Sequence, residues 1–172
     1  DDGGRFLRLR LATHFLTSQI ERYRLENQGP LLFRAGEIFR AITRGSFERL
    51  GTGYAKDDSP LLVGIRRGSE VTVEGMSEGT RDQLYLALRL AALELHLAES
   101  EPMPLILDDL LASFDDERAD AVLQVLLDLS RRTQVFLFTH HKHLVELCER
   151  RGGAAVKMHE LTASNPATLA SP

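Results

Sequence analysis

The sequence predicts an α/β fold in which a parallel sheet is combined with an antiparallel strand segment and an N-terminal coiled-coil-type helix. Two apolar runs, "LILDD" and "TQVFLFTHH", flank an amphipathic stretch, and this order is typical of a βαβ unit with parallel strands. A glycine-punctuated region of short alternating runs precedes them and favours antiparallel strands. Near the N-terminus, apolar residues recur at helical spacing.

The composition is that of one globular domain with a sizeable core. The 172 residues are 43% hydrophobic and 27% charged, and no apolar run approaches the roughly 20 residues of a membrane span. The single cysteine, Cys148, cannot form an internal disulfide, so we expect a reducing cytoplasm and no membrane partner. The first 50 residues carry nine arginines and six acids, which fits either a nucleic-acid contact or a solvated helix face.

The first predicted segment, residues 1–28, is the end of a coiled-coil helix or an ordinary amphipathic helix. Its heptad positions are Phe6, Leu9, Thr13, Leu16, Ile20, Tyr23 and Asn27. A pattern of only three heptads is too short to distinguish a coiled coil from an ordinary amphipathic helix. "NQGP" (27–30) is expected to stop this helix, and a second amphipathic helix is predicted from Leu32 to Thr43.

From Gly45 the pattern changes to short strands, followed by a long helix. We predict antiparallel strands at Phe47–Leu50, Leu61–Arg66 and Glu70–Glu74. The stretch "MSEGTRDQLYLALRLA" then opens a helix that is apolar on most sides and therefore buried on most sides.

The βαβ unit comprises strand 105–108, helix 116–131 and strand 134–139. "KHLVELCER" predicts a short helix, and "GGAAVKMHEL" predicts a turn into a last strand. The domain prediction is thus a coiled-coil end at 1–28, one lobe at 29–161 and a flexible tail at 162–172.

Three side chains are expected to converge at one edge of the parallel sheet. Asp108 and Asp109 end the first strand, His140 ends the second, and the carboxyl ends of parallel strands share an edge where ligands bind. One carboxylate there can hold Mg²⁺, and a second can position or deprotonate a water. A histidine at the neighbouring strand end can contact a phosphate.

The start of the long helix is a second candidate site. Ser77 and Gly79 lie where the helix begins, and a helix start presents unpaired N–H groups and the positive end of the dipole. Such an end suits a phosphate.

Together, "MSEGTRDQLYLALRLA", "PLILDDLLASFDDERADAVLQVL" and "VFLFTHH" resemble the C-terminal half of an ABC-type ATPase head, a P-loop-NTPase-like fold. The resemblance covers residues 70–161 and points to the coiled-coil branch. This branch includes structural-maintenance-of-chromosomes (SMC) proteins, RecN, the ATPase subunit of the SbcCD nuclease and, in particular, YhaN-like bacterial ATPases.

The resemblance implies a role for each matching position. Asp108 matches the Walker B magnesium ligand, Asp109 the catalytic base and His140 the switch histidine. Ser77, Glu78 and Gly79 match the signature loop. The D-loop, which crosses the dimer interface in the family, is matched by Ala112, Ser113, Phe114 and Asp115.

Three departures from the family pattern stand out. Glu78 replaces a glycine, and Asp109 is one methylene shorter than the usual Glu, which shortens its reach to water. No G-x-x-x-x-G-K-[ST] motif is present, since neither "GTGYAKDDS" nor "GGAAVKMHE" has the second glycine before lysine. The chain would therefore be half of one head and inactive alone.

The resemblance further implies ATP and Mg²⁺ as cofactors and DNA repair or chromosome maintenance as the setting. Expected partners are the N-terminal Walker A half of the same head, a second head in a homodimer, DNA and a nuclease subunit. The bacterial cytoplasm, in association with the nucleoid, is the implied location. A head that dimerises around ATP without hydrolysing it remains the alternative.

Other residues allow weaker interpretations. A metal nuclease site would need Asp115 and Asp116 beside the acid pair. "HHKH" (140–143) lacks the i, i+4 spacing of a helical zinc site. Gln83 is interpreted as a helix-surface residue and Cys148 as a buried one, while Arg66 and Arg67 face solvent or contact DNA.

Overall fold

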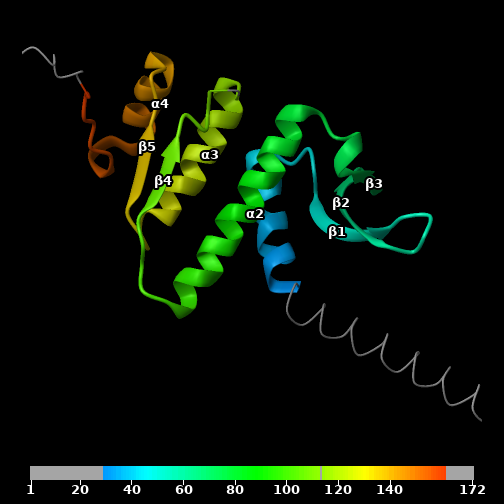
Figure 1. The fold of residues 1–172 in the computed structure, drawn as a ribbon. Coiled ribbons are helices and arrows are strands. Elements are labelled where there is room, and N and C mark those ends of the chain that lie inside the picture. Colours follow the sequence, from blue (N-terminus) through cyan, green and yellow to red (C-terminus); the bar gives the residue numbers. More distant parts are fainter. Residues whose placement is uncertain (1–28, 113, 162–172) are drawn as a thin grey trace, which may run out of the picture.

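The computed structural model describes residues 29–112 and 114–161 (Figure 1). The predicted heptads at 6–27, the tail at 162–172 and Ser113 lie outside these ranges. A helix over 29–42 comes first. The elements after it are β1 (Arg49–Tyr54), β2 (Pro60–Arg66), β3 (Ser69–Thr72), a 3-10 turn (Val73–Gly75), α2 (Glu78–Glu99), β4 (Leu105–Asp108), α3 (Asp116–Leu129), β5 (Val135–Phe138), α4 (Lys142–Gly152) and a second 3-10 turn (Gly153–Ala155).

The helix over 29–42 confirms the amphipathic stretch predicted from Leu32. Its buried side chains are Ala35, Ile38, Phe39 and Ile42, which follow the predicted spacing. Gly29 and Pro30 are themselves helical, so the expected break does not fall on these two residues.

Strands β1, β2 and β3 form the predicted antiparallel sheet, with Arg49 opposite Ile65 and Val63 opposite Thr72. The first strand begins at Arg49, not at the predicted Phe47, because the Phe47 ring is buried against the backbone of β2. A Cβ on Gly64 would lie 2.7 Å from Phe47 Cδ1, so glycine permits this close approach. The third strand ends at Thr72, where the 3-10 turn begins.

Helix α2 begins as predicted but is less buried than predicted. Its first half contributes the buried residues Gln83, Leu84, Leu86, Ala87, Leu90 and Ala91, whereas Leu95 and Ala98 in its second half are exposed. Gln83 is not a surface residue. Its side chain is 1% exposed, and its Nε2 donates to the carbonyl of Ile42 at 2.9 Å, which pairs a free carbonyl at the end of helix 29–42.

The βαβ prediction is confirmed in order and direction; the first strand has the predicted bounds, while the helix ends at Leu129 instead of 131 and the second strand spans Val135–Phe138 instead of 134–139. β4 and β5 are parallel, with Leu105 opposite Val135 and Asp108 opposite Phe138, and α3 connects them. The predicted last strand is wrong, since residues 156–161 form no strand. Gly153 has a φ of +48° and turns the chain into a 3-10 turn, after which Val156 packs back on Gly152.

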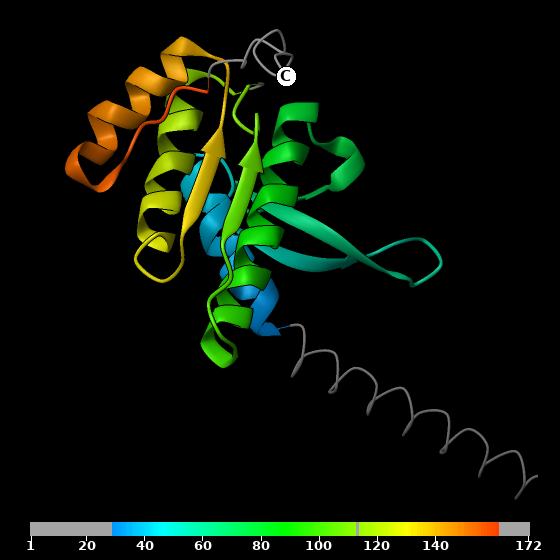
Figure 2. The same ribbon diagram turned by 60° about the vertical axis from the view of Figure 1, so that its left-hand side comes forward.

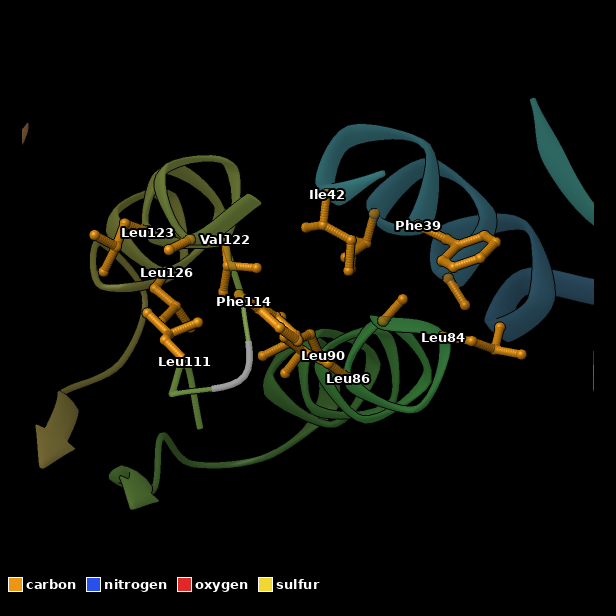
Figure 3. Packing of buried hydrophobic residues seen from close by; sticks show 14 of the residues in the cluster. Phe39, Ile42, Leu84, Leu86, Leu90, Leu111, Phe114, Val122, Leu123 and Leu126 are labelled. Carbon is orange, nitrogen blue, oxygen red and sulfur yellow. The ribbon is translucent and has the colours of Figure 1, made fainter. Parts of the chain in front are cut away.

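The core lies between the helix over 29–42, α2 and α3. Figure 3 shows Phe39 and Ile42 of the first helix facing Leu84 and Leu90 of α2, with Val122 of α3 beyond them. The loop after β4 is anchored in this core by Leu111 and Phe114, both buried; both are drawn in Figure 3. No helix in the described ranges is long and apolar enough to cross a membrane.

In the part of the chain that the structure describes, side chains of the core cover one face of the β4–β5 pair and leave the other face exposed. Leu105, Leu107, Val135 and Leu137 pack against the core, while Ile106, Phe136, Phe138 and Asp108 point the other way and are exposed. In Figure 2 both strands lie in front of α3. Parallel strands are normally buried on both faces, so this bare apolar face is unusual.

Candidate functional site

The predicted site residues other than Ser113, which lies outside the described ranges, are at one end of the molecule. The carboxyl ends of β4 and β5 and the first turns of α2 and α3 all point to the upper end in Figures 1 and 2. The parallel register places Asp108 opposite Phe138, so Asp109 and His140 follow the two strands side by side. The fold therefore positions the acid pair and the histidine as the sequence predicts.

Asp109 and His140 are in contact. His140 Nδ1 lies 3.1 Å from Asp109 Oδ2, although 31 residues separate them along the chain. The Asp109 side chain is 34% exposed and His140 is 75% exposed, so the pair can be reached from outside. A half-buried carboxylate next to an accessible imidazole can accept a proton from water or orient it.

Asp109 is held in an unusual conformation. Its φ is +48°, in the left-handed region, and its N–H donates to the Phe138 carbonyl at 2.9 Å, which continues the ladder beyond the strand ends. Non-glycine residues adopt this region at an energetic cost; within the described ranges only Arg44, Asp58 and Arg67, all in turns or bends, do so besides Asp109. The backbone thus fixes where the carboxylate points.

Two further residues orient the carboxylate, and the sequence reasoning missed both roles. Thr139 Oγ1 donates to Asp109 Oδ1 at 3.2 Å, and the N–H of His141 donates to Thr139 Oγ1, also at 3.2 Å. His141 Nε2 lies 3.7 Å from the same carboxylate oxygen. A hydroxyl directly after an apolar strand and before "HH" was the available signal.

Asp108 differs from Asp109 in its surroundings. It is exposed on the bare face of the sheet, and within the described ranges its carboxylate forms no ion pair or side-chain hydrogen bond. A free carboxylate at a strand end is a suitable ligand for a hydrated Mg²⁺, which is usually bound through one or two carboxylates. The residue present therefore fits the expected metal.

Ser77 is the N-cap of α2. Its hydroxyl accepts from the Thr80 N–H at 3.3 Å and lies 2.8 Å from the Thr80 hydroxyl. Ser77 and Glu78 are exposed, so the first turn of α2 is open to an incoming anion on this side. The predicted helix start is confirmed at the residue level.

The side chain of Arg118 on α3 reaches the first turn of α2. A Cβ on Gly79 would be 3.8 Å from Arg118 Nη1, and Asp115 caps α3 by accepting from the Arg118 N–H at 2.8 Å. Asp115 and Asp116 both lie at this helix start, and the metal-ligand cluster found in the described ranges includes neither. The carboxylate cluster that the nuclease interpretation requires is not formed.

The structure thus gives two neighbouring groups. One contains Asp108, Asp109 and His140, and the other contains Ser77, Glu78, Gly79 and Asp115. In the described part of the chain, no hydrogen bond or ion pair joins the two groups. Cys148 is half-buried, and burial raises the pKa of its thiol, so it favours the neutral thiol and is a poor nucleophile.

Two relatives match by sequence. The uncharacterized protein YhaN of Bacillus subtilis (strain 168) is 34% identical over 137 residues, which are 79% of this chain and 14% of YhaN. The DNA replication and repair protein RecF of Synechococcus sp. (strain JA-3-3Ab) is 32% identical over 117 residues, which are 63% of this chain and 30% of RecF. The chain thus spans less than a third of either relative. No protein-family model matches it.

The fold is that of SMC head domains. A structure from work on ATP-driven dimerization and DNA-stimulated activation of SMC ATPases superposes with a TM-score of 0.57 at 15% identity, covering 73% of this chain and 76% of that one. The parallel strand pair, the capped helix start and the sequence relatives agree with this likeness. The chain belongs to the SMC- and RecF-like ABC ATPases, and it carries the fold of the C-terminal part of their head domain.

Proposed function

We propose that this chain supplies the C-terminal lobe of an ATP-hydrolysing head that dimerises around ATP and Mg²⁺. The observation that carries the proposal is the Asp109–His140 contact at the shared end of β4 and β5, beside the free carboxylate of Asp108. Bound MgATP supplies the phosphoanhydride bond and the charge-neutralising cation; the chain supplies the groups around them.

Each residue has one role in this proposal. Asp108 offers a carboxylate to the magnesium hydration shell, and Asp109 orients the attacking water and accepts its proton. His140, in contact with Asp109, donates toward a terminal phosphate oxygen. Thr139 holds the Asp109 carboxylate in place. Catalysis is then positioning and electrostatic stabilisation, with little covalent chemistry by the protein.

The signature loop serves a second head. Ser77 and the open first turn of α2 present N–H groups to a phosphate held by the opposite head, and Asp115 lies beside them at the start of α3. Glu78 is exposed, so its carboxylate can point away from that phosphate. The SMC ATPase structure cited above concerns ATP-driven dimerization, which supports this arrangement.

The N-terminal Walker A lobe of the same head is the proposed cover for the bare sheet face. Ile106 is 66% exposed there, and Phe136 and Phe138 are about 40% exposed. Such contiguous apolar exposure marks an interface. The phosphate-binding loop that this chain lacks would come from that lobe.

DNA is the proposed substrate on which the assembled head acts. RecF, a relative of this chain, is named for DNA replication and repair. A surface hollow between the end of helix 29–42 and the β2–β3 turn is lined by Arg44, Arg66 and Arg67, together with Gly45, Ser46 and Glu48. Arg44 is paired with Glu117, and Arg66 and Arg67 form no ion pair in the described ranges, so these two guanidinium groups are the ones that suit a phosphate backbone.

The test is steady-state phosphate release by a complete head, made by combining this chain with a Walker A-bearing N-terminal lobe. Asp109→Asn is expected to lower turnover by about 10²-fold, because the amide keeps the shape but cannot accept the proton. Glu146→Gln makes the same carboxylate-to-amide change at an exposed position on α4 and should leave turnover unchanged.

Equal turnover of Asp109→Asn and the parent head would show that Asp109 is not the base. A parent head that dimerises with ATP but releases no phosphate would favour the scaffold alternative.

A further inference from the structure

Three metal-ligating atoms converge at the end of the parallel strand pair. One oxygen of the Asp109 carboxylate, one nitrogen of His140 and one of His141 all lie within 4.8 Å of one another. His140 approaches Oδ2 at 3.1 Å through Nδ1, and His141 approaches Oδ1 at 3.7 Å through Nε2. The two imidazoles lie next to each other, with ring centroids 4.0 Å apart and an angle of 35° between the ring planes.

The distances are close to those of a metal site. Ligands placed 2.0–2.2 Å from a tetrahedral Zn²⁺ are about 3.3–3.6 Å from each other. His140 Nδ1 lies 3.1 Å from Oδ2 and His141 Nε2 lies 3.7 Å from Oδ1, and with one ligand atom from each residue the three atoms lie within 4.8 Å of one another, so a small shift of the exposed His140 would bring them to that separation. His140 is 75% exposed and can shift at little cost, whereas Asp109 and His141 are about two-thirds buried and form the fixed part of the site.

Outer contacts orient the ligands as they do in metal sites. Thr139 donates its hydroxyl to the Asp109 carboxylate and accepts the N–H of His141, so one side chain positions two of the three ligands. The left-handed conformation of Asp109 and its hydrogen bond to Phe138 fix the carboxylate from the backbone side. These contacts do not depend on a nucleotide.

The donor set selects the kind of ion. Two imidazoles and one carboxylate suit Zn²⁺ and other divalent transition metals, whereas Mg²⁺ and Ca²⁺ prefer oxygen ligands. The spacing within "HHKH" did not indicate this site, because the third ligand, Asp109, lies 31 residues before His140 and is brought next to the histidines only by the parallel strand register.

We propose that Asp109, His140 and His141 form a binding site for a divalent transition metal such as Zn²⁺, distinct from the magnesium position at Asp108. An ion bound there occupies the Asp109 oxygens and prevents the carboxylate from accepting a proton from water. The proposed metal binding is argued from the geometry alone. The inhibition of ATP hydrolysis by the bound ion rests on the function proposed above.

Calorimetric titration of the 172-residue chain with Zn²⁺, and optical titration with Co²⁺, test the site directly. We expect one ion per chain, and we expect His141→Gln and Asp109→Asn to weaken binding by at least about 10²-fold. Thr139→Val should weaken it by about 10-fold, because it removes only the orienting hydroxyl.

His143→Gln is the matched control, since His143 lies in the same histidine run but outside the cluster. It should bind Zn²⁺ like the parent chain, and circular dichroism should show the same fold for every variant. No binding by the folded parent, or an equal loss in His143→Gln and His141→Gln, would overturn the site.

The complete head gives the second readout. Zn²⁺ is expected to inhibit phosphate release in the presence of excess Mg²⁺, and the ratio of rates with and without Zn²⁺ should approach one in His141→Gln. If Zn²⁺ binds the chain but leaves the ratio at one in the parent head, the regulatory role is overturned. A head without any turnover would overturn the proposed function and leave the binding result intact.

Discussion

A head carrying Ser77→Arg is expected to bind ATP with the affinity of the parent and to lose ATP-dependent dimerisation. Ser77 is exposed at the first turn of α2, where a second head's phosphate would be bound. A long charged side chain there would fill the space of the phosphate and remain unpaired in the interface. We expect a loss of about 4 kcal/mol, which is about 10³-fold in the dimer dissociation constant.

Analytical ultracentrifugation with and without ATP measures this effect. Glu74→Arg is the matched control, because it introduces the same side chain at an exposed residue of the preceding 3-10 turn. Ser77→Ala distinguishes the loss of the helix cap from an effect on the dimer interface. It removes the hydrogen bond to the Thr80 N–H and should lower the free energy of unfolding by about 1 kcal/mol. Unchanged dimerisation of Ser77→Arg would place the dimer interface elsewhere.

The second large effect is expected at the bare face of the β4–β5 pair. Ile106→Asp should abolish association with the N-terminal lobe, because a carboxylate buried there has no partner and costs about 3 kcal/mol or more. The same change should alter the free energy of unfolding of this chain by less than about 1 kcal/mol, since the Ile106 side chain is 66% exposed.

Co-purification of the two lobes and urea unfolding of the single chain measure both quantities. Phe33→Asp is a control at a residue that is 71% exposed on the helix over 29–42, away from this face. Normal association of the Ile106→Asp lobe would contradict the proposed cover for the sheet.

The sequence predicted correctly those elements whose bounds depend on residues close together in the chain. The apolar run ending in Asp108 and Asp109 gave β4 at its observed bounds, and Ser77 gave the start of α2, because capping and hydrophobic periodicity act over a few residues. The convergence of Asp109 and His140 followed from one topological rule about parallel strands.

The remaining differences come from tertiary contacts that a single pattern does not reveal. Phe47 has the sequence context of a strand residue, but its ring is buried against Gly64. Gln83 has the context of a surface residue, but its side chain donates a hydrogen bond to the carbonyl of Ile42, 41 positions away. The last strand failed because Gly153 adopts a positive φ and redirects the chain. His141 was not paired with Asp109 because only the folded register brings them together.

The central claim is that the acid pair of one head works with the signature loop of another, and mixing two inactive heads tests it most directly. Ser77→Arg and Asp109→Asn heads, each with little turnover alone, are combined in equal amounts at concentrations above the raised dimer dissociation constant of Ser77→Arg, so that the two heads pair at random, and phosphate release is measured. Half of the dimers contain one of each, and one of their two sites is intact, so turnover should recover to about a quarter of the parent value. If the mixture stays as inactive as the separate heads, Asp109 and Ser77 act within the same head and the account is wrong.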